Sequence, residues 1–308
     1  MNAPRRLIAA SAIVAVGVLS LPIVASQRPA SPDRVRIQLL SSGAALYMLY
    51  GAGNSIALIR DDGVVLIDSK TSALAQGTVD AVALVTDRPI TTIINTHAHI
   101  DHTGGNLALP TVTTILAHGG ARAAMQKMDA FSGANAKFLP NKTVGDRMSL
   151  FDGRDRIDLY YFGRGHTDGD LVVVLPGHSI AYMGDLFPLK KKAPVIDAAN
   201  GGSGVAFPDT LDRVLREVTG VTRVVAGHDP GVPPGAPRSA LGDVYNWSDL
   251  QEYAEFNRAF LDTARTAMAQ GKSAAQAAAT LSLPARFAGY DMEQAKANVE
   301  IIYKELAP

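Results

Sequence analysis

A cluster of histidines directly after an apolar run limits what this chain can fold into and bind. The run TTIIN predicts a strand and leads into the segment 95–106, which reads NTHAHIDHTGGN. Residues two apart in an extended segment project to the same side, so His97 and His99 can bind one cation together. Asp101 and His102 follow where the chain turns toward a glycine pair, and they can face a second cation. The segment therefore predicts a metal site at the end of a strand.

Three more candidate ligands occupy similar places in the sequence. His166 follows the run IDLYYF, Asp185 follows SIAYM, and His228 follows TRVVA. Two cations need more ligands than the first four residues offer, and open α/β architectures gather their binding groups at the carboxyl ends of strands. The chain has no cysteine, so imidazole and carboxylate groups must hold any metal, which favours zinc, iron or manganese.

The rest of the sequence alternates short apolar runs with helical stretches, which is typical of an α/β fold. Two predicted hairpins, over 55–69 and 170–185, each end in an aspartate, Asp68 in the first and Asp185 in the second. The other predicted strands are 36–40, 45–51, 91–95, 112–118, 156–163 and 221–228, and the predicted helices are 71–87, 120–128 and 208–220.

The composition changes after the proline- and glycine-rich segment 229–240. Helix-forming residues then dominate, and Ser248 is the predicted N-cap of the first of three helices. We therefore expect a main domain over 27–245 and a helical extension over 246–308 that packs on it through its apolar face. The predicted helices of the extension are 247–271, 272–281 and 291–306.

The first 26 residues are typical of a secretory signal. Two arginines precede an apolar run over 7–25, and small residues precede Gln27 at the expected cleavage point. The sequence therefore predicts export to the periplasm. The run is also close to the ~20 residues that span a bilayer, so a retained N-terminal membrane anchor facing the periplasm is the alternative.

The overall charge does not indicate a macromolecular partner. Lysine plus arginine and aspartate plus glutamate both number 29. Removing residues 1–26 takes away Arg5 and Arg6 and no acid, which leaves 27 basic and 29 acidic residues and a net charge of −2. Without a basic excess the sequence predicts no nucleic-acid binding, and nothing in it implies a protein partner or an oligomeric state.

Five motifs together resemble the metallo-β-lactamase fold superfamily, which includes glyoxalase II, lactonases and zinc β-lactamases. They are GVVLIDS, NTHAHIDHTGGN, GHTDGD, MGD and AGH, in this order between about Val35 and Pro230. The resemblance implies a four-layer αββα sandwich with two metal ions at one edge between the sheets. It also implies that Asp68 supports the ligands from outside. The implied ligands are His97, His99 and His166 for the first metal, Asp101, His102 and His228 for the second, and Asp185 between the two.

The aspartate at position 185 is similar to that of glyoxalase II and the lactonases, because zinc β-lactamases generally carry cysteine or serine there. The resemblance therefore implies a dinuclear zinc hydrolase that cleaves an ester, lactone, thioester or lactam bond of a small-molecule substrate. Two ions can share a bridging water and lower its pKa to about 7, which makes hydroxide available as the nucleophile. Asp101 would orient this hydroxide and later shuttle its proton.

Three alternatives stay open. An aspartate at position 185 does not exclude β-lactam hydrolysis. A mononuclear iron oxygenase, similar to the sulfur dioxygenases, would use His166 and Asp185 with His97 or His99 as its ligands. A non-catalytic metal-binding protein is the third alternative, although relatives of that kind usually lose ligands and none is missing here.

Candidate substrate contacts are Lys190, Asn200 and Tyr50. Lys190 can meet a substrate carboxylate, Asn200 can donate to an oxyanion, and Tyr50 flanks a short loop that can rim the site. The alternative for these three is a solvated lysine run, a turn asparagine and a packing tyrosine. His118 and His178 lie outside the ligand pattern, and we predict structural roles for them.

Overall fold

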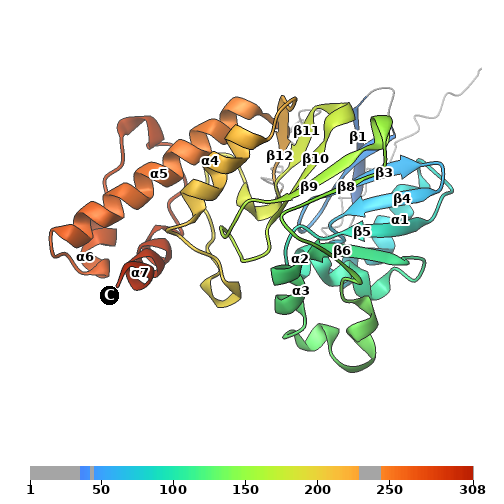
Figure 1. The fold of residues 1–308 in the computed structure, drawn as a ribbon, viewed down its shortest axis with the longest axis horizontal. Helices are drawn as coiled ribbons and strands as arrows, with labels where there is room; N and C mark the ends of the chain where they lie inside the picture. Colours follow the sequence, from blue (N-terminus) through green and yellow to red (C-terminus); the bar gives the residue numbers. More distant parts are fainter. Residues whose placement is uncertain (1–34, 42–44, 229–243, 308) are drawn as a thin grey trace, which may run out of the picture. The chain divides into compact units, whose positions relative to one another are not determined.

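Two β-sheets pack face to face in this computed structural model, which describes residues 35–41, 45–228 and 244–307 (Figure 1). All of them belong to one unit, Pro32–Pro308. The predicted signal over 1–26 and the whole segment 229–240 lie outside the described residues. Among the residues described, no helix is both long and apolar enough to cross a membrane.

The first sheet has the strand order β1-β2-β3-β4-β5-β6-β7, and the second has the order β13-β12-β11-β10-β9-β8. Strands β1 to β4 pair antiparallel, whereas β4 to β7 pair parallel, so several strands end at the same edge. The strands are β1 (Arg36–Ser41), β2 (Leu46–Tyr50), β3 (Ser55–Arg60), β4 (Gly63–Ile67), β5 (Ile90–Ile94), β6 (Thr114–His118), β7 (Lys142–Val144), β8 (Arg147–Leu150), β9 (Ile157–Tyr161), β10 (Leu171–Leu175), β11 (Ile180–Tyr182), β12 (Arg223–Val225) and β13 (Val244–Asn246).

Strand β10 shows how the layers are built. Successive side chains of a strand point to opposite faces, and all five residues of β10 are buried. Leu171, Val173 and Leu175 join the apolar layer between the two sheets. Val172 and Val174 join the layer between the second sheet and the helices outside it. A continuous apolar run is therefore a strand with both faces covered.

Helices cover the outer face of each sheet (Figure 1). Ala81 and Val82 of α1 pack with Leu66 and Ile93 of the first sheet, whereas α4 and the C-terminal helices pack on the second sheet. This order of layers confirms the predicted αββα sandwich. The helices are α1 (Ala75–Ala83), α2 (Ile100–Thr103), α3 (Gly119–Met125), α4 (Phe207–Glu217), α5 (Trp247–Ala269), α6 (Ala274–Ala279) and α7 (Ala295–Leu306).

The C-terminal helices α5, α6 and α7 share one apolar core with α4 and the second sheet. Strand β13 pairs with β12 immediately before α5 begins. The predicted N-cap Ser248 is wrong, because α5 begins at Trp247 and Asn246 caps it. The backbone N–H of Asn246 donates to the carboxylate of Asp249 over 2.9 Å, which closes a capping box. The division at residues 245 and 246 stays a prediction.

Strand β13, with the sequence VYN, was not predicted, and its side chains are exposed or only partly buried. Strands β7 and β8 were not predicted either. Their sequences are KTV and RMSL, and most of their side chains are exposed or only partly buried. Neither strand therefore carries the apolar run from which the other strands were predicted.

Candidate metal centre

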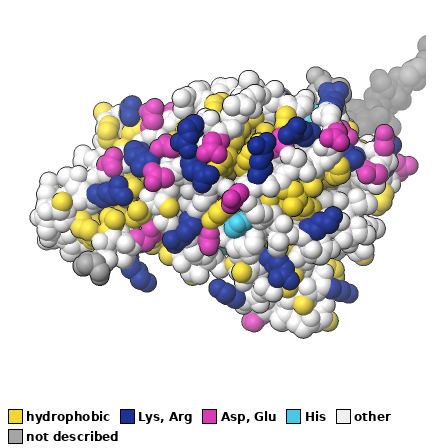
Figure 2. Space-filling model, viewed as in Figure 1, with side chains coloured by type: hydrophobic (Ala, Val, Ile, Leu, Met, Phe, Trp, Pro, Cys, Tyr) yellow, Lys and Arg dark blue, Asp and Glu magenta, His cyan; other side chains and the backbone are white. Residues whose placement is uncertain are grey.

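The seven predicted ligands come together at the edge where strands β5, β9, β11 and β12 end. They form two neighbouring groups, and within each group one potential ligand atom per residue lies within 4.8 Å of the others. Figure 2 shows a histidine at the surface of this face with acidic side chains beside it. The first group is His97, His99, His166 and Asp185, and the second group is Asp101, His102 and His228.

The first group is built around three imidazoles. Nε2 of His166 lies 2.9 Å from Nδ1 of His99, and the His97 ring lies 4.8 Å from each of these two rings. Nε2 of His97 is buried without a hydrogen-bond partner. A carboxylate oxygen of Asp185 lies 3.7 Å from Nε2 of His166. Unpaired buried polar atoms are rare in folded proteins, so this nitrogen is suited to donate its lone pair to a metal ion.

The outward nitrogens of these imidazoles all have acceptors. Nδ1 of His97 faces the hydroxyl of Thr96 at 3.0 Å, and that hydroxyl donates to Asp68 over 2.7 Å. Nδ1 of His166 faces the carbonyl of Val195 at 2.7 Å. We assign the ring protons to these outward nitrogens, which leaves lone pairs on the inward ones.

The remaining imidazole of the first group follows the same rule, because Nε2 of His99 faces a carboxylate oxygen of Asp197 at 2.8 Å. Burial and the neighbouring histidines lower the pKa values of His97 and His166. Neutral imidazoles that point lone pairs at one another are donors for a cation. The residues present therefore fit a divalent metal ion.

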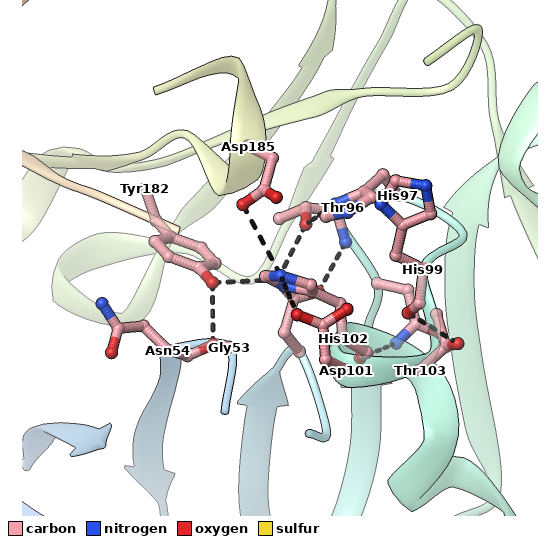
Figure 3. Close-up of polar contacts among 12 residues, drawn as sticks. Gly53, Asn54, Thr96, His97, His99, Asp101, His102, Thr103, Tyr182 and Asp185 are labelled. Atoms are coloured by element: carbon pink, nitrogen blue, oxygen red, sulfur yellow. Dashed lines mark hydrogen bonds and ion pairs between the residues drawn. The ribbon is translucent and has the colours of Figure 1, made fainter. Parts of the chain in front are cut away.

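The second group has the same kind of donors. Nε2 of His102 lies 3.5 Å from Nε2 of His228, and a carboxylate oxygen of Asp101 lies 3.6 Å and 3.5 Å from these two atoms. Asp185 reaches this group as well, at 3.2 Å from Nε2 of His228 and 3.6 Å from Nε2 of His102. Figure 3 shows the Asp185 carboxylate aimed at His102. Asp185 therefore lies between the two groups, and its role as a bridging ligand stays a prediction.

Asp68 supports the second group from outside, where the sequence placed it. Its buried carboxylate accepts from Nδ1 of His102 over 2.7 Å, from the backbone N–H of Thr96 over 2.7 Å and from the hydroxyl of Tyr182 over 2.9 Å. Burial by itself lowers the pKa of His102, but the charges of Asp68 and Asp185 outweigh it and raise that pKa to about 9. The carboxylate therefore makes His102 a more basic ligand.

The loop Gly51–Asn54 closes over the second group, and Lys70 holds it. A Cβ at Gly53 would lie 2.8 Å from Nε2 of His102, so only glycine fits at this position. The buried ammonium of Lys70 donates to the carbonyls of Leu49, Gly51 and Gly53 over 2.9, 2.9 and 2.6 Å. Sequence reasoning missed this lysine, whose only signal is its place directly after the strand in LIDSK.

Asp197 is the second residue that sequence reasoning missed. Besides facing His99, its carboxylate accepts from the backbone N–H groups of Ala199 and Asn200 over 3.1 and 3.2 Å. These bonds cap the short 3₁₀ helix η8 (Ala198–Asn200). An aspartate before a turn usually accepts hydrogen bonds from the backbone of that turn. The sequence therefore gave no reason to expect that Asp197 contacts His99.

The predicted substrate contacts lie in three different settings. Tyr50 is buried in the layer between the sheets, and its hydroxyl donates to Gln38 over 3.1 Å. Lys190 forms an ion pair with Asp249 at 2.8 Å. The amide of Asn200 donates over 2.6 Å to the carboxylate of Asp197, which in turn faces His99. Their roles toward a substrate stay predictions.

The two other histidines lie outside both groups. His118 stacks on Tyr161 with ring centroids 3.8 Å apart and accepts from the backbone N–H of Gly120 over 3.1 Å. His178 is buried at the connection between β10 and β11. Neither is part of a metal-binding group among the described residues.

Comparison with known proteins agrees with the fold. The chain matches the metallo-beta-lactamase superfamily over residues 49–243, more than half of its length, and it belongs to this superfamily. A metallo-beta-lactamase type 2 from Bacillus sp. (strain 170) is 29% identical over 178 residues, which cover 57% of this chain. The match spans 66% of that relative, just under two thirds of its length.

Two solved structures share the fold. A metallo-beta-lactamase from Pontibacter korlensis has a TM-score of 0.59 at 18% identity, covering 73% of this chain and 99% of that chain. The stereoselective inverting sec-alkylsulfatase Pisa1 from Pseudomonas sp. has a TM-score of 0.66 at 15% identity, covering 88% of this chain and 50% of that chain. At these identities the likeness concerns the fold alone.

Proposed function

We propose that this chain is a metal-dependent hydrolase of a small-molecule substrate, with two ions held by the two groups. The main observation is the inward set of lone pairs, in which the buried Nε2 of His97 has no hydrogen-bond partner among the described residues. Zinc is the proposed ion because the donors are imidazoles and carboxylates only. Iron and manganese are the alternatives.

Two divalent ions at these groups would lower the pKa of a shared water to about 7. They would also polarise the substrate carbonyl whose bond to the leaving atom is cleaved. Asp101 is the residue that would orient this water and take its proton at a carboxylate oxygen. Its side chain is 31% exposed, so it lies on the open side of the second group. Before a metal binds, protonated His102 and the hydrogen bond and charge of His228 hold the pKa of Asp185 well below its usual range despite burial, so its carboxylate is anionic.

The bond that is cleaved is proposed as an ester, lactone, thioester or lactam, because all four present a carbonyl to the same arrangement. β-Lactam hydrolysis is the second candidate, favoured by the relatives in Bacillus species whose names state this activity. Export is part of the proposal as well: the arginine pair and the apolar run before Gln27 support a periplasmic protein.

A hydrolysis panel on the zinc-loaded full chain tests this function. The panel contains esters, homoserine lactones, thioesters and the β-lactam nitrocefin. We expect at least one member to be hydrolysed, with activity lost on chelation and restored by zinc, and His166→Ala to be inactive. A protein that binds two zinc ions and hydrolyses no member of the panel would instead be a non-catalytic metal-binding protein.

A test for export follows the chain in cell fractions. We expect periplasmic protein that has lost residues 1–26. Full-length protein in the membrane fraction would indicate the retained anchor, and full-length protein in the cytoplasm would contradict export.

A further inference from the structure

One face of the C-terminal helix α7 contacts a loop that borders the first group. The contacting residues are Asn298, Ile302 and Glu305, whose spacing of four and three places them on one side of a helix. The loop consists of residues 194–205, which we call the outer loop, and it leads into α4. Its contacts with α7 join parts of the chain about a hundred positions apart.

Helix α7 holds the outer loop near both of its ends. The buried amide of Asn298 donates to the carbonyl of Pro194 over 2.8 Å. The carboxylate of Glu305 accepts from the hydroxyl of Ser203 over 2.5 Å and from the backbone N–H of Gly204 over 3.0 Å. It also faces the backbone N–H of the next residue at 3.3 Å.

Close packing supplements these hydrogen bonds. A Cβ at Gly204 would lie 2.6 Å from Cγ1 of Ile302, so loop and helix are in direct contact. Ile302 and Ile196 belong to the same apolar core. The outer loop is therefore fixed by buried contacts as well as by polar ones.

The same loop orients two imidazoles of the first group. Its Val195 carbonyl accepts from Nδ1 of His166, and its Asp197 carboxylate accepts from Nε2 of His99. The backbone N–H of Asp197 also donates to the carbonyl of His166 over 2.9 Å. These bonds turn the other ring nitrogens inward, so the loop position sets the ligand geometry.

We propose that α7 is a positioning element for the first metal group, which acts through Glu305 and Asn298 on the outer loop. This inference rests on the proposed function, because it requires that the first group binds a metal ion. The second group is held by Asp68 and by the loop on Lys70, and the described contacts of these residues do not involve α7. Loss of the α7 contacts should therefore weaken metal binding at the first group only.

The test measures zinc affinity of the full chain by competition with a chromogenic chelator in two parent proteins. His228→Ala leaves the first group complete, and His166→Ala leaves the second group complete. Adding Glu305→Ala to the first parent should raise the zinc Kd about tenfold, the lower end of the range for residues that orient ligands. Adding it to the second parent should leave the zinc Kd unchanged.

A matched control lies on the same helix. Within the part of the chain that the structure describes, Glu300 forms an ion pair with Lys296 alone, at 3.9 Å, and its side chain is 54% exposed. Glu300→Ala should therefore change neither affinity. Glu305→Gln keeps one oxygen acceptor and should give an intermediate loss at the first group. It also carries the comparison if circular dichroism shows that Glu305→Ala does not fold.

Two results would overturn the inference. The first is an unchanged zinc Kd for folded Glu305→Ala and Glu305→Gln in the His228→Ala parent. The second is an equal loss in both parents, which would show a general loss of stability. If neither parent binds zinc, the proposed function itself fails, and this outcome is distinct from a failure of the positioning role.

Discussion

The two metal-binding groups differ in how deeply they lie. In the first group His97, His166 and Asp185 are all buried, with at most 8% of each residue exposed. In the second group the side chains of Asp101 and His228 are 31% and 35% exposed. The side chain of His99 in the first group is 27% exposed, and His102 in the second group is fully buried. The second group is therefore the more open of the two at Asp101 and His228.

The groups also differ in what holds them. The first depends on a loop, since Val195 and Asp197 orient its imidazoles from residues 194–205. The second depends on residues next to strand β4, namely Asp68 and Lys70. The loop is held by contacts with the C-terminal helix α7, whereas Asp68 and Lys70 follow a strand of the first sheet.

Asp185→Ala should have the largest effect, because this carboxylate lies between the groups and touches both. We expect kcat/KM to fall more than about 100-fold, beyond the usual loss for an outer partner, and bound zinc to fall from two ions to one. Steady-state kinetics and elemental analysis measure these changes. Wild-type activity with a single ion would show that the two groups do not act together.

Lys70→Met should weaken the second group and the fold. Three buried carbonyls would lose a charged donor, so the free energy of unfolding should fall by about 3 kcal/mol. Urea denaturation measures this, and Lys296→Met, at a side chain that is 75% exposed, is the control. The zinc Kd should rise in the His166→Ala protein, which keeps only the second group complete, and not in the His228→Ala protein. An equal rise in both proteins would contradict separate supports for the two groups.

Asp197→Asn should weaken the first group alone. The amide oxygen can still cap η8, but the charge that faces His99 is lost, so the zinc Kd in the His228→Ala protein should rise about tenfold. Chelator competition measures it. The same change in the His166→Ala protein should have no effect, and an effect there would count against separate supports.

Lys190→Ala should have the smallest effect and should spare both groups. Its ion pair with Asp249 is partly exposed, so the free energy of unfolding should change by less than about 1 kcal/mol. Zinc content should stay the same. If Lys190 meets a substrate carboxylate, KM should rise up to about fivefold for an acidic substrate, a change of about 1 kcal/mol. Equal KM changes for acidic and neutral substrates would refute that contact.

The alternation of apolar and helical runs predicted an α/β fold, and the family resemblance implied its four layers. The candidate ligands could be found for one physical reason. Each ligand follows an apolar run, and strands that run together bring their ends to one edge. Lys70 and Glu305 could not be predicted in this way. Lysine and glutamate are usually exposed, and the contact of Glu305 with Ser203 spans 102 positions. Strands β7 and β8 could not be predicted because most of their side chains are not buried, so they form no apolar run.

The direct test of the account is the number of zinc ions that the full chain binds. Metal-free protein is titrated with zinc and analysed after removal of free ions, together with His166→Ala and His228→Ala. The account predicts two ions per chain in the parent and one in each variant. A parent that binds a single ion, or a variant that keeps two, would contradict the claim that the two groups are two metal sites.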